Sequence, residues 1–320
     1  MASYTIGLVS IPSRVYQEQA ATAFIQSVKN DARSAGWWKF TIKEFSVAGS
    51  GDSVLLNAVC ESAIQAGVDV IVTTGWMCSQ AAVQACKRRH SSIPIVFLGV
   101  IDPVELEIVD SLKKPGGNAT GVSPSGGVRT DPTLLLTAAK PDWKRALLPY
   151  GVVADGNEKY AESIRKRCAL TGQEVTLLPI DNVSDTLLKI ESLLSGHDVL
   201  MYLEGDLLVS YGAAFGKIAS KYGVTMLAGS LDGLDESALT FADNPTPVAA
   251  EAFEMVKRIL IRGESPATMS IECLPNVYGF TINRALCAEQ DLADIDISRV
   301  VSAVRSDPSL ESVHDHIIIK

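Results

Sequence analysis

A strand–helix–strand pattern that occurs twice is the feature that most constrains the fold. Residues 69–99 predict an apolar strand, a helix and a second apolar strand, and residues 198–229 predict the same order. In this register Val70-Ile71-Val72 corresponds to Val199-Leu200-Met201. Strands that are apolar along their whole length are typical of a parallel sheet covered by helices on both faces. The repeat therefore predicts an α/β protein with two similar halves.

The same alternation extends along most of the chain. Strands are expected at residues 4–10, 40–46, 68–74, 94–99, 146–153, 174–180, 198–203 and 224–228. Helices are expected at 16–35, 53–66, 79–89, 104–112, 158–171, 185–194, 207–222 and 247–262, the last ending at Gly263. Alternating strands and helices indicate βαβ units and doubly wound sheets. The glycine-rich residues 115–123 interrupt the alternation, so we expect a linker or crossover there.

Length and charge narrow the class of protein further. A chain of 320 residues exceeds the usual size of one hydrophobic core and predicts two domains. A hydrophobic share of 47% with 20% charged residues excludes a disordered or fibrous chain. The net charge of −9 argues against nucleic acid as a partner. The first ten residues show no basic start and no separate apolar core of the kind found in export signals, so we expect either a cytosolic protein or one whose signal has been removed.

The cysteines predict neither a disulfide framework nor a metal site. The six cysteines form no Cys-x-x-Cys pair and no Cys/His cluster with zinc spacing. We expect most of them to be buried as small apolar side chains. No metal and no cofactor is expected.

Three runs of residues carry a family resemblance. Ile93–Phe97 reads IPIVF, Asp102-Pro103 follows it, and residues 114–123 read KPGGNATGVS. These runs resemble the signature of the TrpX-type ABC-transporter substrate-binding proteins, which are similar to the type I periplasmic binding proteins. Residues 227–230 and 280–283 also fit, and the resemblance extends over residues 4–292.

The resemblance implies two Rossmann-like, doubly wound lobes joined by a hinge, with a small ligand held between them. Lobe 1 would comprise residues 1–121 and a returning helix at about 246–268. Lobe 2 would comprise residues 122–230, and residues 231–320 would contribute crossover segments to both lobes. Known ligands of the family include aromatic amino acids.

The resemblance also implies partners and a location. The protein would capture a small molecule by hinge closure and dock on an ABC permease in the membrane. It would be extracytoplasmic, either periplasmic or a membrane-anchored lipoprotein, with its signal removed. We expect a monomer that binds no nucleic acid.

The predicted site lies where strands end and helices begin, because ligands of open α/β sheets bind at that edge. Gly75 permits a tight turn, and a helix beginning near Ser79 would offer N–H groups to a carboxylate. Ser79 would otherwise only cap that helix. Trp76 offers a flat face for an aromatic or apolar ligand. In the second half, Glu204 or Asp206 would pair with a ligand ammonium, unless both are solvated loop charges.

The other candidates follow neighbouring strands or lie near the crossovers. Tyr16 would close the cleft, Asp102 caps a helix by default, and Asn157 would reach the ligand from the second half. The full set of predicted ligand-binding residues is Tyr16, Trp76, Met77, Ser79, Gln80, Asp102, Ser123, Asn157, Glu204, Asp206 and Ser230.

Catalytic patterns are missing from the sequence. A racemase that uses Cys78 as a base would need a second cysteine in the matching loop, where Gly205-Asp206 stands instead. The turn after the first strand has no Gly-x-Gly-x-x-Gly motif for a dinucleotide. We therefore predict a non-catalytic solute-binding protein of an ABC importer, with an aromatic or apolar amino acid as ligand. A ligand-sensing domain of the same fold and a neutral ligand such as a nucleoside remain alternatives.

Overall fold

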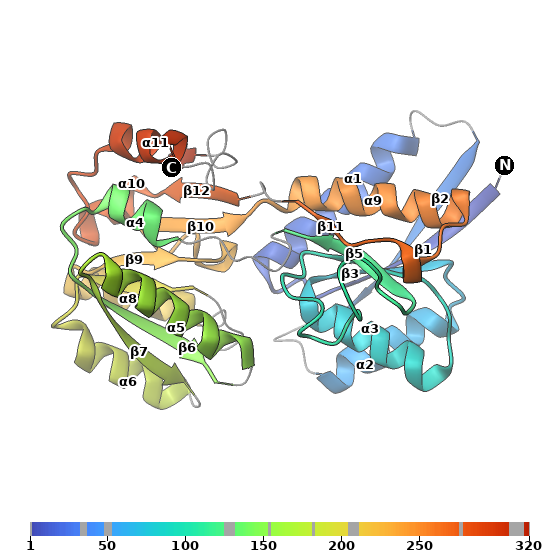
Figure 1. Ribbon diagram of the computed structural model, residues 1–320, viewed down its shortest axis with the longest axis horizontal. Helices are drawn as coiled ribbons and strands as arrows, with labels where there is room; N and C mark the ends of the chain where they lie inside the picture. Colours follow the sequence, from blue (N-terminus) through green and yellow to red (C-terminus); the bar gives the residue numbers. More distant parts are fainter. Residues whose placement is uncertain are drawn as a thin grey trace. The chain divides into compact units, whose positions relative to one another are not determined.

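A computed structural model describes residues 2–32, 37–47, 53–124, 132–152, 155–180, 183–203, 211–274, 278–306 and 317–319. The chain divides into two compact units. The first unit comprises residues 1–129 and 244–277, and the second comprises residues 130–243 and 278–320. Each unit has one sheet with helices on both faces (Figure 1), which confirms the predicted α/β class.

The first unit contains a parallel sheet in which the strand order reverses. Its described strands lie in the order β11-β5-β4-β3-β1-β2. Their bounds are β1 (Ala2–Ser10), β2 (Trp38–Ser46), β3 (Val70–Thr74), β4 (Ile95–Leu98), β5 (Ala119–Ser123) and β11 (Glu272–Cys273). From β1 the chain goes to β2 on one side and then to β3 on the other. The carboxyl ends of β1 and β3 therefore form a topological switch point, where ligands of such sheets bind.

Helices cover both faces of this sheet. α1 (Val15–Ala32) and α9 (Pro245–Arg262) lie side by side on one face, and α2 (Ser53–Gln65) and α3 (Gly75–Arg89) cover the other (Figure 1). Phe24 and Phe253 meet edge to face, with ring centroids 5.9 Å apart, where α1 packs on α9. The Asn244 side chain caps α9 and Gly263, with φ 71°, ends it, as the sequence predicts.

The second unit has the same strand order with an antiparallel addition. Its described strands lie in the order β13-β12-β10-β9-β8-β6-β7, and β12 is antiparallel to β10. Their bounds are β6 (Arg145–Gly151), β7 (Glu174–Ile180), β8 (Val199–Tyr202), β9 (Thr225–Ala228), β10 (Leu239–Asp243), β12 (Tyr278–Ile282) and β13 (Ile317–Ile319). The order β10-β9-β8-β6-β7 matches β5-β4-β3-β1-β2 of the first unit. The predicted internal repeat is therefore confirmed, because β3 and β4 correspond to β8 and β9.

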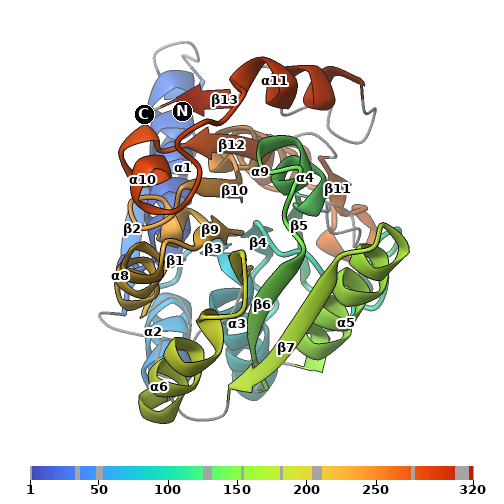
Figure 2. The same ribbon diagram turned by 90° about the vertical axis from the view of Figure 1, so that its left-hand side faces the viewer.

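The helices of the second unit also lie on both faces of its sheet. α6 (Val183–Leu194) and α8 (Gly212–Tyr222) cover one face (Figure 2). The other face is covered by α4 (Thr133–Ala139), α5 (Asp155–Leu170), α10 (Arg284–Glu289) and α11 (Ile297–Ser306). Short 3-10 turns occur at Leu231–Gly233 and, in the first unit, at Pro266–Thr268.

Residues 119–123 of the glycine-rich signature form a strand and not a linker, which corrects this part of the prediction. This strand is β5, whose five residues are all buried between β4 and β11. The Asn118 amide donates to the carbonyl of Ile93 at 2.7 Å, and the Thr120 hydroxyl donates to the carbonyl of Met269 at 2.9 Å. The glycines indicate close packing here rather than flexibility, because Gly121 lies directly against Phe97.

A second prediction was wrong at residues 104–112, which form turns and not a helix. The N–H groups of Ile108 and Val109 both donate to the carbonyl of Pro103. Glu107 has a φ of 53°, in the left-handed region, which interrupts a right-handed helix.

Most of the cysteines are buried, as the sequence predicts. Five of the six cysteines are buried and Cys273 is exposed, and all are free thiols. Within the described ranges, no His, Cys, Asp or Glu residues group in a way that would hold a metal ion. None of the helices in those ranges has the length and apolar character that a membrane crossing needs.

An aspartate precedes the central strand of each sheet, β3 and β8, and makes similar hydrogen bonds in the two units. The Asp69 carboxylate accepts a hydrogen bond from the N–H of Thr5 at 2.6 Å. The Asp198 carboxylate accepts from Lys144 and Arg145, at 2.7 and 2.9 Å. Burial opposes ionisation of Asp198, but these two N–H groups and the charges of Lys140 and Arg145 together lower its pKa.

Asp198→Asn is expected to destabilise the second unit by about 1 kcal/mol at neutral pH, because an amide oxygen accepts more weakly than a carboxylate. Because the pKa of Asp198 is lower in the folded protein, its ionised carboxylate stabilises the fold fully at pH values above the ordinary carboxyl pKa. This stabilisation is lost as the pH falls through the pKa of the folded protein. Urea unfolding at pH 7 and in the acid range measures the difference between the two proteins. The difference in unfolding free energy should become smaller as the pH is lowered. Asp142→Asn serves as the control, because Asp142 is exposed. A pH-independent difference would contradict this account.

Candidate functional site

The candidate site is the carboxyl edge of the first unit's sheet at the switch point, here called the first-unit edge. It comprises the ends of β1, β3 and β4 and the first turns of α1 and α3. β3 ends at Thr74, and α3 begins at the next residue. Three strand ends and two helix starts therefore lie at one edge of the sheet, the arrangement that binds ligands in doubly wound sheets.

The turn from β3 into α3 depends on Gly75. Thr74 is extended, with φ −102°, and Gly75 has φ 70°, which glycine adopts without strain. Thr74 occupies the cap position but makes no side-chain capping bond to the helix. The N–H groups of the first turn of α3 and its positive dipole end are therefore suited to an anion.

Ser79 does not begin α3, which corrects the prediction. The helix begins four residues earlier because Gly75 lets the strand enter it directly. Ser79 is fully buried, and its hydroxyl donates to the carbonyl of Gly75 at 2.6 Å and lies 2.8 Å from the Thr73 hydroxyl oxygen. A contact between Ser79 and the ligand stays a prediction. The hydrogen bonds of its hydroxyl within the protein argue against such a contact.

The other residues of the predicted loop lie in the first two turns of α3. Trp76 and Met77 are half-buried and pack against the core between the sheet and α2 and α3. Gln80 is half-buried, and its amide donates to the carbonyl of Leu106 at 3.3 Å. Their ligand contacts remain predictions, with Trp76 and Met77 closest to the start of the helix.

Tyr16 also lies at the first-unit edge. It is half-buried at the start of α1, and its ring packs on Gly99, just after β4. A Cβ atom at Gly99 would lie only 2.8 Å from ring atoms of Tyr16. The structure thus brings Tyr16, β4 and α3 into one neighbourhood within the first unit.

Asp102 and Ser123 follow β4 and β5 at the same edge. Asp102 is half-buried, and its carbonyl accepts from the N–H of Leu106 at 3.1 Å. It therefore begins a turn and does not cap a helix as the sequence predicts. Ser123 is fully buried, and its hydroxyl donates to the carbonyl of Ile101 at 3.2 Å.

The predicted contacts of the second half are less fully described. Ser230 is half-buried after β9, and its carbonyl accepts from the N–H of Gly233 at 3.1 Å. Asn157 belongs to the first turn of α5, but its side chain is not among those described. Glu204 and Asp206 lie outside the described residues, so their roles stay predictions.

Gln17 connects the parts of the first-unit edge, although it is not among the residues predicted from the sequence. Only 5% of this residue is exposed. Its Oε1 accepts from the N–H of Ile11 at 3.2 Å and from the Thr74 hydroxyl at 3.3 Å, and the Cys78 thiol lies 3.8 Å away. A signal was present, because Gln17 is the polar member of the apolar stripe that continues with Ala20, Ala21, Phe24 and Val28 along α1.

Positive charge at this edge comes from Arg14, which is buried immediately before α1, while Asp102 is an acidic residue at the same edge. The pKa of the Cys78 thiol is raised, chiefly by burial and further by Cys60, while the charge of Arg14 acts in the opposite direction. Cys78 is therefore a neutral thiol, unsuited to act as a base. Arg14 adds positive potential to the site that the start of α3 provides.

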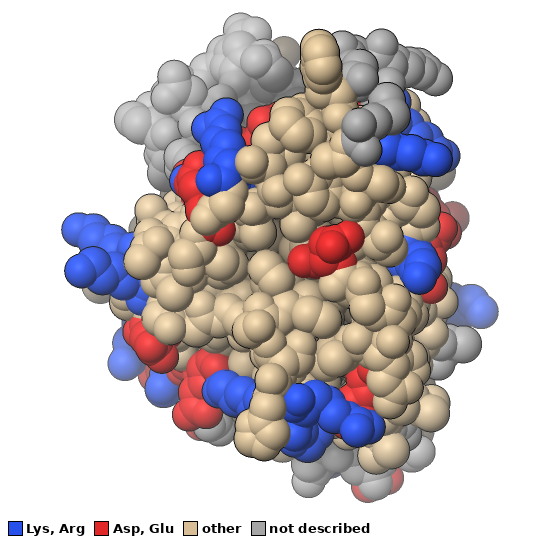
Figure 3. All heavy atoms as spheres, turned by 90° about the vertical axis from the view of Figure 1, so that its right-hand side faces the viewer, with Lys and Arg blue, Asp and Glu red and all other residues tan. Residues whose placement is uncertain are grey.

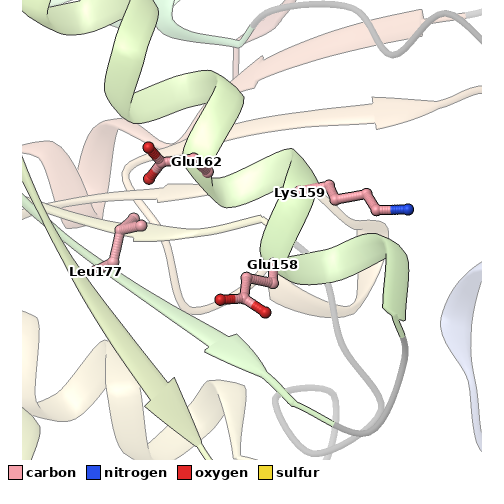
Figure 4. A pocket seen from close by; sticks show the side chains of 4 residues that line it. All are labelled: Glu158, Lys159, Glu162 and Leu177. Atoms are coloured by element: carbon pink, nitrogen blue, oxygen red, sulfur yellow. The ribbon is translucent and has the colours of Figure 1, made fainter.

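A separate hollow of about 580 Å³ lies on the second unit between α5 and β7 (Figure 4). Glu158 and Glu162 face the side of Leu177, while Lys159 points away from it. Glu162 pairs with Arg165 at 2.6 Å and with Lys166 at 3.8 Å. Glu158 and Glu162 place two carboxylates in its lining, so this hollow suits a ligand carboxylate less well than the first-unit edge does.

Figure 3 shows one face of the molecule in full. Its centre is largely uncharged, and Lys and Arg side chains form separate groups around it, with Asp and Glu among them. On α2 and α3, Arg88 and Arg89 both pair with Glu61. Among the described residues of this face, Figure 3 shows no continuous basic stripe.

The sequence matches a known family over most of its length. The family model described as "ABC transporter substrate binding protein" matches residues 25–303. A tyrosine-binding protein of Clostridioides difficile (strain R20291) is 26% identical over 235 residues. That alignment covers 73% of this chain and 66% of the relative, so the chain spans slightly less than two thirds of the relative's length.

Solved structures show the same fold. An ABC domain from Streptococcus pneumoniae in complex with L-Trp matches with a TM-score of 0.76 and 16% identity, over 99% of this chain and 100% of that chain. The ligand-free, open structure of a substrate binding protein with adhesive properties from Clostridium difficile matches with a TM-score of 0.70 and 20% identity, over 99% of each chain. The family model and the shared fold agree with the signature residues: this chain belongs to the ABC transporter substrate-binding protein family.

Proposed function

We propose that the protein is a non-catalytic solute-binding component of an ABC importer and that its ligand is an aromatic amino acid. The family match over residues 25–303 carries the solute-binding role. The ligand class is supported by a relative described as tyrosine-binding and by a structural neighbour solved with L-Trp. A half-buried tryptophan at the start of α3 fits such a ligand.

The proposed binding mode follows from the first-unit edge. The ligand carboxylate would accept hydrogen bonds from the first turn of α3, where the helix dipole and the charge of Arg14 both favour an anion. The aromatic ring would lie against Trp76, with Tyr16 nearby. The ammonium group is assigned to Glu204 or Asp206. Hinge closure, a membrane permease as partner and an extracytoplasmic location complete the proposal.

Calorimetric titration tests the ligand class. The panel contains L-tryptophan, L-tyrosine, L-phenylalanine and L-leucine, with tryptamine, myo-inositol and adenosine as comparisons. At least one aromatic amino acid should bind and raise the thermal midpoint, because a ligand of the folded state stabilises it by mass action. Tryptamine should bind much more weakly because it lacks the carboxylate. Binding of only the sugar alcohol or the nucleoside would contradict the proposed ligand class.

Trp76→Ala is expected to weaken binding of the aromatic ligand by about 1–2 kcal/mol, which corresponds to roughly five- to thirtyfold, because a stacked aromatic face is lost. Titration of both proteins with the same amino acid measures the change. Trp37→Ala is the matched control, since Trp37 is 79% exposed and lies in the same unit. If both variants bind like the original protein, Trp76 makes no ligand contact.

A further inference from the structure

The orientation of the Gln17 side-chain amide is determined by its surroundings. Oε1 lies 3.2 Å from the backbone nitrogen of Ile11, and a backbone N–H can only donate. The oxygen must therefore face Ile11, since a flipped amide would set two donors against each other. The amide nitrogen consequently points to the opposite side.

On that opposite side, the amide nitrogen meets the start of α3. Nε2 lies so near Gly75 that a Cβ atom there would be 2.9 Å from it. Within the described part of the chain, no residue accepts a hydrogen bond from Nε2, although only 5% of Gln17 is exposed. Nε2 is not among the fully enclosed side-chain atoms that lack a partner, so it keeps some access to the surface of the first-unit edge. An acceptor that a ligand brings to this point can therefore reach it.

The position of Nε2 connects it with the proposed carboxylate site. The first turn of α3 begins at Gly75 and carries the N–H groups that suit an anion. A carboxylate has two oxygens, so it can accept from the helix start with one and from a side-chain amide with the other. The side chain is already held by Ile11 and Thr74, so little conformational entropy is lost when it donates.

We infer that Gln17 is a specificity-determining residue whose Nε2 donates to the ligand carboxylate and so selects acids over the corresponding amides. This inference rests on the proposed function. It explains why a glutamine lies in the apolar stripe of α1. It also gives a second reason for a glycine at position 75, besides its left-handed φ, because a Cβ atom there would crowd Nε2 of Gln17.

The variant Gln17→Glu separates the two sides of the amide. It keeps an oxygen for Ile11 and Thr74 and replaces the Nε2 donor with a second acceptor. We expect the affinity for the aromatic amino acid that the protein binds to fall at least tenfold. Gln26→Glu, which changes an exposed glutamine of the same helix, should bind within twofold of the original protein.

A ligand pair distinguishes specificity from a structural defect. L-tryptophan and L-tryptophanamide differ only in the group that Gln17 is inferred to contact. Because the amide ligand can donate to an acceptor at residue 17, its affinity relative to that of the acid should rise at least tenfold in Gln17→Glu. Gln17→Met, which lacks any donor, should also shift the ratio in this direction and serves if Gln17→Glu does not fold.

Each outcome supports or overturns a defined statement. An unchanged acid-to-amide ratio in a folded variant, or an equal loss of both ligands, overturns the inference and leaves the proposed function standing. Failure of the original protein to bind any aromatic amino acid overturns the proposed ligand class, and the inference with it.

Discussion

Replacement of Gln290 with leucine is expected to lower the free energy of unfolding of the second unit by about 3–5 kcal/mol. Gln290 is fully buried after α10. Its Oε1 accepts from the N–H groups of Met226 and Ala238 at 3.1 and 2.9 Å, and its Nε2 donates to the carbonyl of Glu236 at 2.9 Å. Leucine fills a similar volume but leaves these three backbone groups buried without partners.

Chemical denaturation followed by tryptophan fluorescence measures this effect. Trp143 reports on the second unit, where it is fully buried. Gln26→Leu is the control, because Gln26 is exposed and, among the described residues, its side chain is hydrogen-bonded only to Asn30. A loss below about 1 kcal/mol in Gln290→Leu would show that the freed groups find water and that the amide is dispensable.

Gly121→Ala is expected to destabilise the first unit by about 2–3 kcal/mol, because the core there has no room for one more carbon. A Cβ atom at Gly121 would overlap the carbonyl oxygen of Phe97 and come within 2.5 Å of its ring. Phe97 is fully buried in β4, so neither the backbone nor the ring can move aside without disturbing the sheet.

The same signature supplies the control for this prediction. Gly117 has open space where a Cβ atom would stand, so Gly117→Ala should change the unfolding free energy little. Thermal and urea unfolding of both variants give the comparison. Equal stability of the two would contradict a packing role for Gly121, and a large loss in Gly117→Ala would indicate a backbone requirement at that position.

Patterns with a fixed period predicted the fold well. The repeat of residues 69–99 at 198–229 indicated two sheets of like topology, and β3 and β8 do occupy corresponding places. Such patterns succeed because a strand buried on both faces must be apolar throughout. The long helix ending at Gly263 was predicted for a similar reason, since its apolar stripe and C-cap are both visible in the sequence.

The local conformations that failed depend on single backbone angles. The start of α3 at Gly75 depends on a left-handed glycine, and the turns after Asp102 depend on the positive φ of Glu107. The glycines of the signature were interpreted as flexible, yet Gly121 is needed for close packing. A sequence does not show whether a glycine is selected for its freedom or for its size.

Topology alone led to the prediction that the site lies at the carboxyl edge of a sheet, and this stays a prediction. Tyr16 and Trp76 lie at the first-unit edge, but Gln17 was missed because its partners, Ile11 and Thr74, become neighbours only through the fold. All the ligand contacts stay predictions, and Glu204 and Asp206 lie outside the described residues.

The division of the first unit into two chain segments has a consequence for biosynthesis. Residues 1–129 leave the ribosome before the residues that form α9, which packs on α1 and contributes Phe253 to the core. Until residue 262 has emerged, the nascent first unit exposes the apolar side of α1 and one face of its sheet. The first unit is therefore expected to complete its folding only after α9 has been synthesised, and not as its first segment leaves the ribosome. A chaperone that shields apolar surface would act during this interval.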